Sequence, residues 1–174
     1  MKTGWQKAGV RILTTLLTAA VMVMIFCFST ENAEQSDQRS GVFSQIIIRT
    51  VHPDYDLLDA AQQKRIYDNT QMVVRKCAHF SEYALLGFLI RLCMESWFGH
   101  RTLKRHLPAI AGFVSGSLYA VTDELHQLAI DGRYGKWTDV LIDSAGVLAG
   151  VILGTLLICM SVRKQKAERD AGWQ

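Results

Sequence analysis

The sequence predicts an all-α membrane protein, a polytopic four-helix bundle that forms a single domain over residues 1–174. Three observations support this fold class. The apolar residues gather in four long stretches, the basic residues gather in both tails and one loop, and the polar residues within the stretches lie toward a common end. A hydrophobic content of 49% would suit a soluble protein equally well, so the distribution along the chain decides the class.

The first predicted span covers about 8–28. Its central run over 12–28 contains 17 residues without a charge, and Arg11 can extend its side chain to the interface. A hydrocarbon core of roughly 30 Å requires about 20 helical residues, so this stretch is adequate. Its basic start resembles a signal peptide, but no small-residue cleavage pattern follows it. We therefore predict an uncleaved membrane anchor.

The other three predicted spans cover about 77–94, 107–125 and 139–162. The second contains three ionisable residues, and its alternative interpretation is an amphipathic helix on the membrane surface. The longest uncharged run is 16 residues in the third span, slightly short of a crossing, and 19 residues in the fourth. An even number of crossings, which places both termini on the same side of the membrane, requires the second helix to span and so argues against the surface-helix alternative.

The basic residues assign both termini and the loop over 91–106 to the cytoplasm. These regions contain eleven basic and three acidic residues, whereas the rest of the chain contains eight basic and thirteen acidic residues. The positive-inside rule then places segments 29–76 and 126–138 outside. A net charge of +3, divided in this way, argues against a nucleic-acid partner and favours contact with anionic membrane lipids.

The outer segment over 29–76 is too long to be a simple turn. Its first part, 29–40, is rich in Ser, Glu, Gln and Asp, and we expect a loop there. Pro53 should break any helix that reaches it. From Asp56 onward, apolar residues recur at helical spacing, which predicts an extracytoplasmic interfacial helix that continues into the second span.

Polar residues lie where each predicted span reaches the outer face. Ionisable groups in a bilayer are costly, so a convergent set of them is a candidate functional site. Arg75, His79 and Glu82 have i, i+4, i+7 spacing and therefore share one helix face. Asp139 and Asp143 share a face in the same way.

Gly146 and Gly150 continue the face of these two aspartates and predict the close approach of a neighbouring helix. The end of the third span presents another polar face, from which Glu124 is rotated away. The short glycine-rich loop that follows should hold Arg133 near the same outer end of the predicted bundle. The predicted binding residues are Arg75, His79, Glu82, Asp123, His126, Gln127, Arg133, Asp139 and Asp143.

Several chemistries are compatible with this set. The candidates for general acid–base catalysis are Glu82, Asp123, His126 and Asp143. A divalent metal is a second option, with His79, His126 and Asp143 as ligands, although their spacing matches no compact metal motif. A purely structural role is the alternative for each residue, for example Asp139 as a helix N-cap. No Ser-His-Asp order or Gly-x-Ser-x-Gly elbow indicates a serine nucleophile.

Four blocks between residues 28 and 150 match a known family pattern in order and spacing. They are Phe28-Ser29; Arg75-Lys76-x-Ala78-His79-Phe80-x-Glu82-Tyr83-x-Leu85-Leu86-Gly87; Asp123-Glu124-x-His126-Gln127; and Gly132-Arg133 with Asp139-Val140, Asp143-x-x-Gly146 and Gly150. The chain resembles the VanZ-like family, named for a glycopeptide-resistance accessory protein associated with teicoplanin. One departure is Glu31, where the family often has Gln. The resemblance implies a polytopic bacterial membrane protein linked to envelope-acting lipoglycopeptides.

Together, the residues and the resemblance predict a multi-pass protein of the bacterial cell membrane. Its outward-facing pocket would bind a lipid-linked envelope precursor or limit the access of a lipid-tailed antibiotic, with Arg75 and Arg133 on an anionic headgroup. One alternative is an enzyme that modifies an envelope lipid by acid–base or metal-assisted chemistry. A second alternative is a proton-coupled transporter.

Overall fold

The computed structural model describes residues 4–31, 33–98, 106–130 and 136–171, and these residues form helices and short connections without a strand. The all-α prediction is therefore confirmed for this part of the chain. The elements are α1 (Gly4–Ser29), α2 (Ala33–Val51), the short 3-10 helix η1 (Tyr55–Leu57), α3 (Ala60–Phe98), α4 (Leu107–Gln127) and α5 (Trp137–Ala171).

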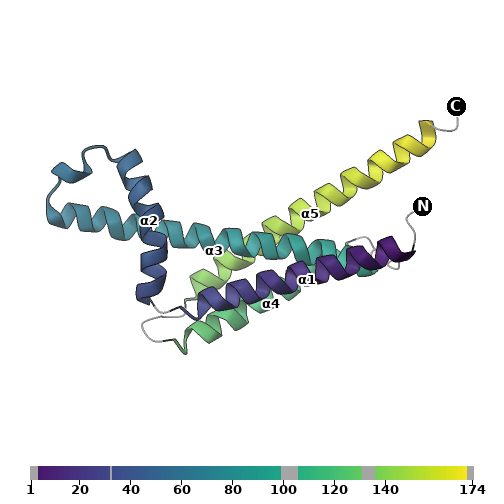
Figure 1. The fold of residues 1–174 in the computed structure, drawn as a ribbon, viewed down its shortest axis with the longest axis horizontal. Coiled ribbons are helices and arrows are strands. Elements are labelled where there is room, and N and C mark those ends of the chain that lie inside the picture. The colour runs from purple at the N-terminus through teal and green to yellow at the C-terminus, as the bar shows by residue number, and fades with distance from the viewer. Residues whose placement is uncertain (1–3, 32, 99–105, 131–135, 172–174) are drawn as a thin grey trace.

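Helix α3 is the centre of the structure, because it contacts α1, α2, α4 and α5. Helices α1, α3 and α4 run alongside one another, α5 crosses α3 at an angle, and α2 lies across α3 near the opposite end from the termini (Figure 1). Both termini lie at the same end of the molecule (Figure 1). The apolar core is formed by Ile25 of α1, Tyr83, Leu86 and Ile90 of α3, Ala120 of α4, and Val147 and Val151 of α5.

Glycines bring α3 and α5 into backbone contact. A Cβ atom on Gly146 would collide with the carbonyl oxygen of Phe80, and one on Gly150 would collide with that of Ala84. Gly87 meets the backbone of Val147 from the other side in the same way. The predicted close approach along this face of α5 is confirmed. It places the start of α5, with its two aspartates, directly against α3.

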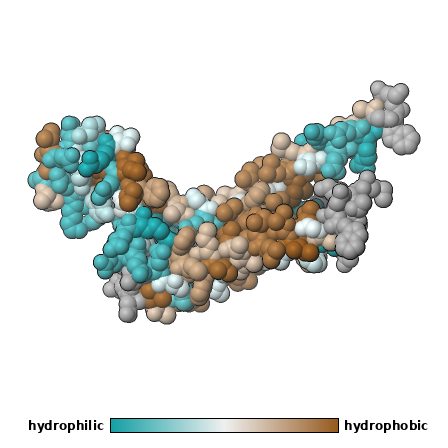
Figure 2. Space-filling model, viewed as in Figure 1, coloured by the Kyte–Doolittle hydropathy of each residue, from teal (hydrophilic) through white to brown (hydrophobic). Residues whose placement is uncertain are grey.

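Exposed aliphatic side chains form a belt around the middle of the long helices (Figure 2). Within the described chain, three helices are long and apolar enough to cross a membrane: α1 from Lys7, α3 and α5. These correspond to three of the four predicted spans. Helix α4 is not among them: its 21 residues are long enough for a crossing, but Asp123 and Glu124 in its last turns lower its mean hydropathy.

The segment between the first two predicted spans differs from expectation in one respect. The loop predicted over 29–40 is wrong, because α2 begins at Ala33 and continues to Val51. The expected break near Pro53 is confirmed, since α2 ends two residues before it. The expected continuation into the second span is also confirmed, because α3 is one helix of 39 residues.

Arg91 is a further correction. The charge analysis treated it as the first residue of a cytoplasmic loop, but it lies inside α3 and is only 2% exposed. Its guanidinium donates to Thr155 Oγ1 of α5 and to Glu95 Oε2, each at 3.0 Å. A buried charge needs such partners, so Arg91 belongs to the helix packing rather than to a loop.

Candidate functional site

A polar cavity of about 470 Å³ lies at the end of the bundle opposite the termini. It is enclosed by α2, the first half of α3, the end of α4 and the start of α5. The lining residues are Asp37, Tyr67, Asp68, Gln71, Met72, Arg75, Lys76, His79, Glu124, Gln127, Lys136, Thr138, Asp139, Ile142 and Asp143. We call this the larger cavity. It brings five carboxylates and three permanent cations to one surface.

Two ion pairs connect the helices around the larger cavity. Arg75 Nη1 of α3 lies 3.2 Å from Asp37 Oδ1 of α2, and Lys76 Nζ lies 3.3 Å from Asp139 Oδ1 of α5. Both pairs are partly exposed, so their contribution to stability is at most about 1 kcal/mol each. Their main effect is to fix where the charged groups stand.

Asp143 is the most deeply buried carboxylate of the larger cavity, with 1% of its surface exposed. Its Oδ1 atom lies 3.8 Å from Nδ1 of His79, which is an ion-pair distance but too long for a direct hydrogen bond. That oxygen has no hydrogen-bond partner among the described residues. A buried carboxylate oxygen that no protein donor satisfies can accept a hydrogen bond from a ligand or a water molecule.

Glu124 corrects the expectation that it is rotated away from the site. It lines the larger cavity, is 7% exposed, and its Oε1 accepts a hydrogen bond of 2.5 Å from the backbone N–H of Lys136. This bond ties the residue before α5 to the end of α4. Glu124 therefore forms part of the cavity wall, although His126 and not Glu124 was predicted to face the site.

Asp123 lies behind the lining of the larger cavity. It is 3% exposed, and its Oδ2 accepts a hydrogen bond of 3.1 Å from Gln127 Nε2. The same amide nitrogen lies 3.4 Å from Ser29 Oγ at the end of α1. Gln127 thus links the cavity wall to α1, and Asp123 supports Gln127 from inside the bundle.

A second, smaller cavity of about 210 Å³ adjoins the larger one and lies between α3, α2 and the end of α1. Its surface is more apolar than that of the larger cavity. The lining residues are Phe28, Ser36, Arg39, Ser40, Phe43, Val74, Arg75, Ala78, His79 and Glu82. Arg75 and His79 line both cavities. Glu82, another predicted binding residue, lines only the smaller cavity.

The charged wall of the smaller cavity is built largely by Arg39 of α2. Its guanidinium pairs with Glu31 at 3.0 Å and lies 3.9 Å from the centroid of the Phe28 ring. A cation over an aromatic face is attracted by the ring electrons. This arrangement fixes the end of α1 to the beginning of α2.

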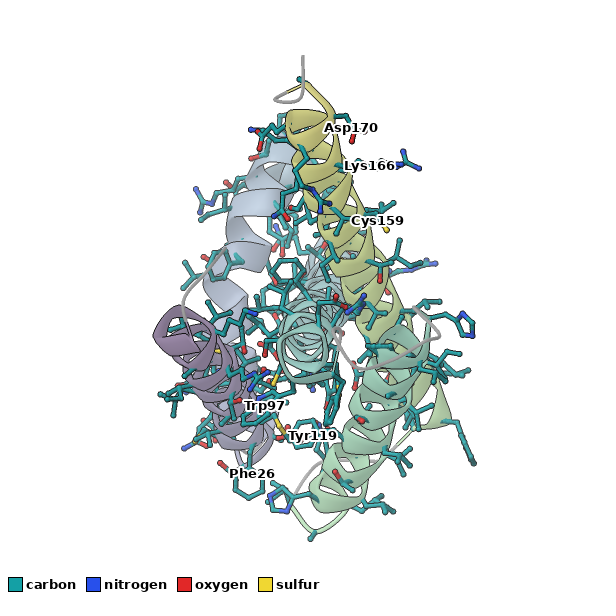
Figure 3. The ribbon with its side chains drawn as sticks, turned by 90° about the vertical axis from the view of Figure 1, so that its right-hand side faces the viewer. Phe26, Trp97, Tyr119, Cys159, Lys166 and Asp170 are labelled. Atoms are coloured by element: carbon teal, nitrogen blue, oxygen red, sulfur yellow. The ribbon has the colours of Figure 1, made fainter. Side chains whose placement is uncertain are left out.

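His126 does not join the other predicted residues. Its ring stacks on Phe26 of α1, with the centroids 4.7 Å apart, and it lines neither cavity. Figure 3 shows Phe26 at the outer edge of the bundle, below Tyr119, whose hydroxyl donates to Met22 O at 2.7 Å. Arg133 lies outside the described residues.

The hypothetical metal ligands are not assembled by the fold. Among the residues that the structure describes, no group of three His, Cys, Asp or Glu side chains is close enough to share a metal ion. His79 and Asp143 face each other, but His126 stacks on α1. The set His79, His126 and Asp143 is therefore not brought to one place.

The contribution of α2 to both cavities was missed from the sequence. Asp37 and Arg39 come from the segment that was expected to be a loop, and Gln71 donates to the backbone oxygen of Asp37 at 3.1 Å. The signal that could have revealed this helix is the repeat of Ser36, Ser40 and Ser44 at four-residue spacing.

The fold and the site define an all-helical membrane protein with a charged cavity at one end of its apolar belt. Comparison with protein families then shows that residues 14–158 match the VanZ/LLP1 family, so the chain belongs to that family. The resemblance found in the four sequence blocks is confirmed. No curated protein and no solved structure matches the chain.

Proposed function

We propose that this VanZ-family protein binds the polar headgroup of a lipid-linked cell-envelope component in the larger cavity. In this proposal the protein crosses the bacterial cell membrane four times, with α4 as the fourth crossing and both termini in the cytoplasm. Binding would lower the susceptibility of the cell to teicoplanin-type lipoglycopeptides by limiting their access to that component.

The observation that carries this proposal is the chemistry of the larger cavity. Arg75, Lys76 and Lys136 can bind an anionic group, while the carboxylates of Glu124 and Asp143 can accept hydrogen bonds from hydroxyl or amino groups. A headgroup that contains both phosphate and sugar or peptide groups matches this mixture. The hydrophilic end of the molecule borders its hydrophobic surface (Figure 2), so a ligand with its headgroup at this end could remain anchored in the membrane.

The test compares growth inhibition by teicoplanin and by vancomycin in a susceptible Gram-positive host. The host expresses the wild-type protein, Asp143→Asn or Glu124→Gln at matched membrane levels, with the exposed Asp56→Asn as the control. Losing one charge-assisted hydrogen bond to a ligand costs about 1.5–3 kcal/mol, or about 10- to 100-fold in affinity. We expect the wild type and the control to protect against teicoplanin, and the two cavity variants to lose that protection.

Mass spectrometry of lipids that copurify with each protein gives the direct measurement. The wild type and the control should retain one class of envelope lipid that Asp143→Asn loses. Full protection and unchanged copurifying lipid in both cavity variants would exclude the larger cavity as the binding site.

A second candidate function is acid–base modification of the bound lipid. It is favoured by the pairing of His79 with the buried Asp143 at the cavity wall, because a carboxylate can orient an imidazole for proton transfer. This function requires a covalent change in a lipid. Lipid mass spectra that are identical with and without the protein would eliminate it and leave binding as the activity.

A further inference from the structure

Helix α2 has the reverse of the usual amphipathic pattern. The buried residues of this helix are Ser36, Gly41, Ser44 and Ile48, so small and polar residues form most of its buried side and Ile48 is the one large apolar member. Part of the exposed side, in the second half of the helix, is an apolar patch. Its members Val42, Phe43, Ile46 and Ile47 are between 43% and 64% exposed.

A contiguous apolar helix face is not stable against water, so this side of α2 requires an apolar neighbour. Helix α2 lies across the long axis of the bundle (Figure 1), which is the orientation of a helix that lies in the membrane interface. The chain also carries the exposed aliphatic belt of a membrane protein. The neighbour that fits this face is therefore the hydrocarbon of the bilayer.

Phe43 connects this lipid-facing side to the smaller cavity. Its side chain is 62% exposed, and it also lines the cavity together with Phe28, Val74 and Ala78. The smaller cavity is thus bordered by the same side chain that would contact lipid. A hydrocarbon chain could enter it sideways from the membrane without passing through water.

Arg75 and His79 stand between the two cavities, because both residues line each of them. Arg75 uses Nη1 for its ion pair with Asp37. A guanidinium has five N–H donors, so it can bind a phosphate while this pair remains. The smaller cavity, which has the larger apolar share of surface, therefore meets the larger cavity at the cationic Arg75. Hydrocarbon chain, phosphate and polar headgroup follow one another in the same order in a phosphate-containing lipid.

We propose that the smaller cavity binds the headgroup-proximal part of the hydrocarbon chain of a phosphate-containing membrane lipid. The headgroup of the same lipid occupies the larger cavity, and Arg75 contacts the phosphate between them. This inference rests on the proposed function and adds the ligand class, the place of its chain and its sideways route of entry.

The test is photocrosslinking of the full chain in lipid nanodiscs. The probes are a phosphatidylglycerol and a polyprenyl phosphate, each with a diazirine close to the polar group. Ser36 is the reporter, because it lines the smaller cavity but is only 7% exposed and therefore cannot be labelled by lipid at the outer surface. We expect labelling of Ser36 by at least one probe, and the probe that labels it identifies the chain as diacyl or isoprenoid.

Ala78→Phe fills the smaller cavity from an exposed position on α3 that the larger cavity does not use. We expect Ser36 labelling to fall about tenfold, because the bulky ring would occupy the space that the hydrocarbon chain must enter. The matched control is Ala145→Phe, an exposed alanine of α5 that lines neither cavity. It should leave the labelling unchanged.

Two outcomes separate this inference from the proposed function. If neither probe labels Ser36 in the wild type, or Ala78→Phe leaves the labelling unchanged, the chain site is overturned. The copurifying lipid and its dependence on Asp143 can still be present in that case, and the headgroup proposal then stands alone. If Ser36 is labelled while Asp143→Asn has no effect on copurifying lipid, the proposed headgroup site fails instead.

Discussion

Arg91 illustrates how a single charged residue is accommodated between apolar helices. Its guanidinium is buried, yet Thr155 and Glu95 each accept one of its hydrogen bonds. A buried charge without partners would cost several kcal/mol, so these two acceptors decide whether α3 and α5 can pack here. Asp143 differs from Arg91, because its Oδ1 has no hydrogen-bond partner among the described residues and lies 3.8 Å from His79 Nδ1.

Thr155→Val tests the contribution of the Arg91 network. The substitution preserves the shape of the side chain but removes the acceptor for Arg91 Nε. Leaving a buried charged donor unsatisfied should lower the free energy of unfolding by about 1–3 kcal/mol. Thermal unfolding of the purified protein in detergent measures this loss as a lower Tm.

The control for this experiment is Thr122→Val. The Thr122 hydroxyl is exposed and donates only within its own helix, to Tyr119 O. An equal decrease of Tm in both variants would show that the Arg91 hydrogen bond to α5 contributes little.

At the scale of elements, the length of α3 positions the site. A helix of 39 residues extends about 58 Å, roughly twice the thickness of the hydrocarbon core. The first half of α3 can therefore project beyond the membrane and carry Arg75 and Lys76 to α2 and α5. The glycines of α5 then fix the distance between α5 and α3, and with it the distance from Asp143 to His79.

Gly150→Ala should disrupt this pair of helices. The added methyl group would meet the backbone of Ala84, which cannot rotate away as a flexible side chain could. We expect a loss of about 1–3 kcal/mol in stability, the usual range for overpacking, and a lower Tm in detergent. Because α5 would shift against α3, the copurifying lipid expected under the proposed function should also be lost.

Gly9→Ala provides the matched comparison for this substitution. Nothing lies within 4 Å of a Cβ atom at Gly9, and alanine favours a helix more than glycine does. This variant should keep or raise the Tm. If Gly150→Ala behaves like Gly9→Ala, the close contact between α3 and α5 is not important for stability.

At the scale of the whole molecule, the apolar belt separates two polar ends. The end near the termini carries basic residues, including Arg163 and Lys166 of α5, whereas the opposite end carries both cavities (Figures 1 and 2). From the positive-inside rule we predict that the cavities face the outside of the cell, as the proposed function requires.

Cysteine labelling in cells tests this orientation. In a background with the four native cysteines replaced, Asp68→Cys lies at the cavity end and Lys166→Cys lies near the C-terminus, and both positions are exposed. A membrane-impermeant maleimide should label Asp68→Cys in intact cells. It should label Lys166→Cys only after the membrane is permeabilised, and the reverse pattern would invert the topology.

Much of the fold and part of the site follow from local features of the sequence. The helix break near Pro53 was predicted from the proline, and the close contact at Gly146 and Gly150 and the common face of Arg75 and His79 were predicted from spacing. These features could be predicted because they depend on the period of a helix and on the size of single side chains.

The sequence alone determined the helical class, the apolar segments and the kinds of polar residue at one end, because hydrophobicity and helical period are local properties of the chain. Only the tertiary structure decided that Glu124 lines the larger cavity while His126 stacks on Phe26. It also decided that α2 forms and that Ser36, Ser44 and Ile48 are on its buried side. At a helix end, and on a helix with an apolar outer face, the neighbouring elements rather than the residue pattern select which side is buried.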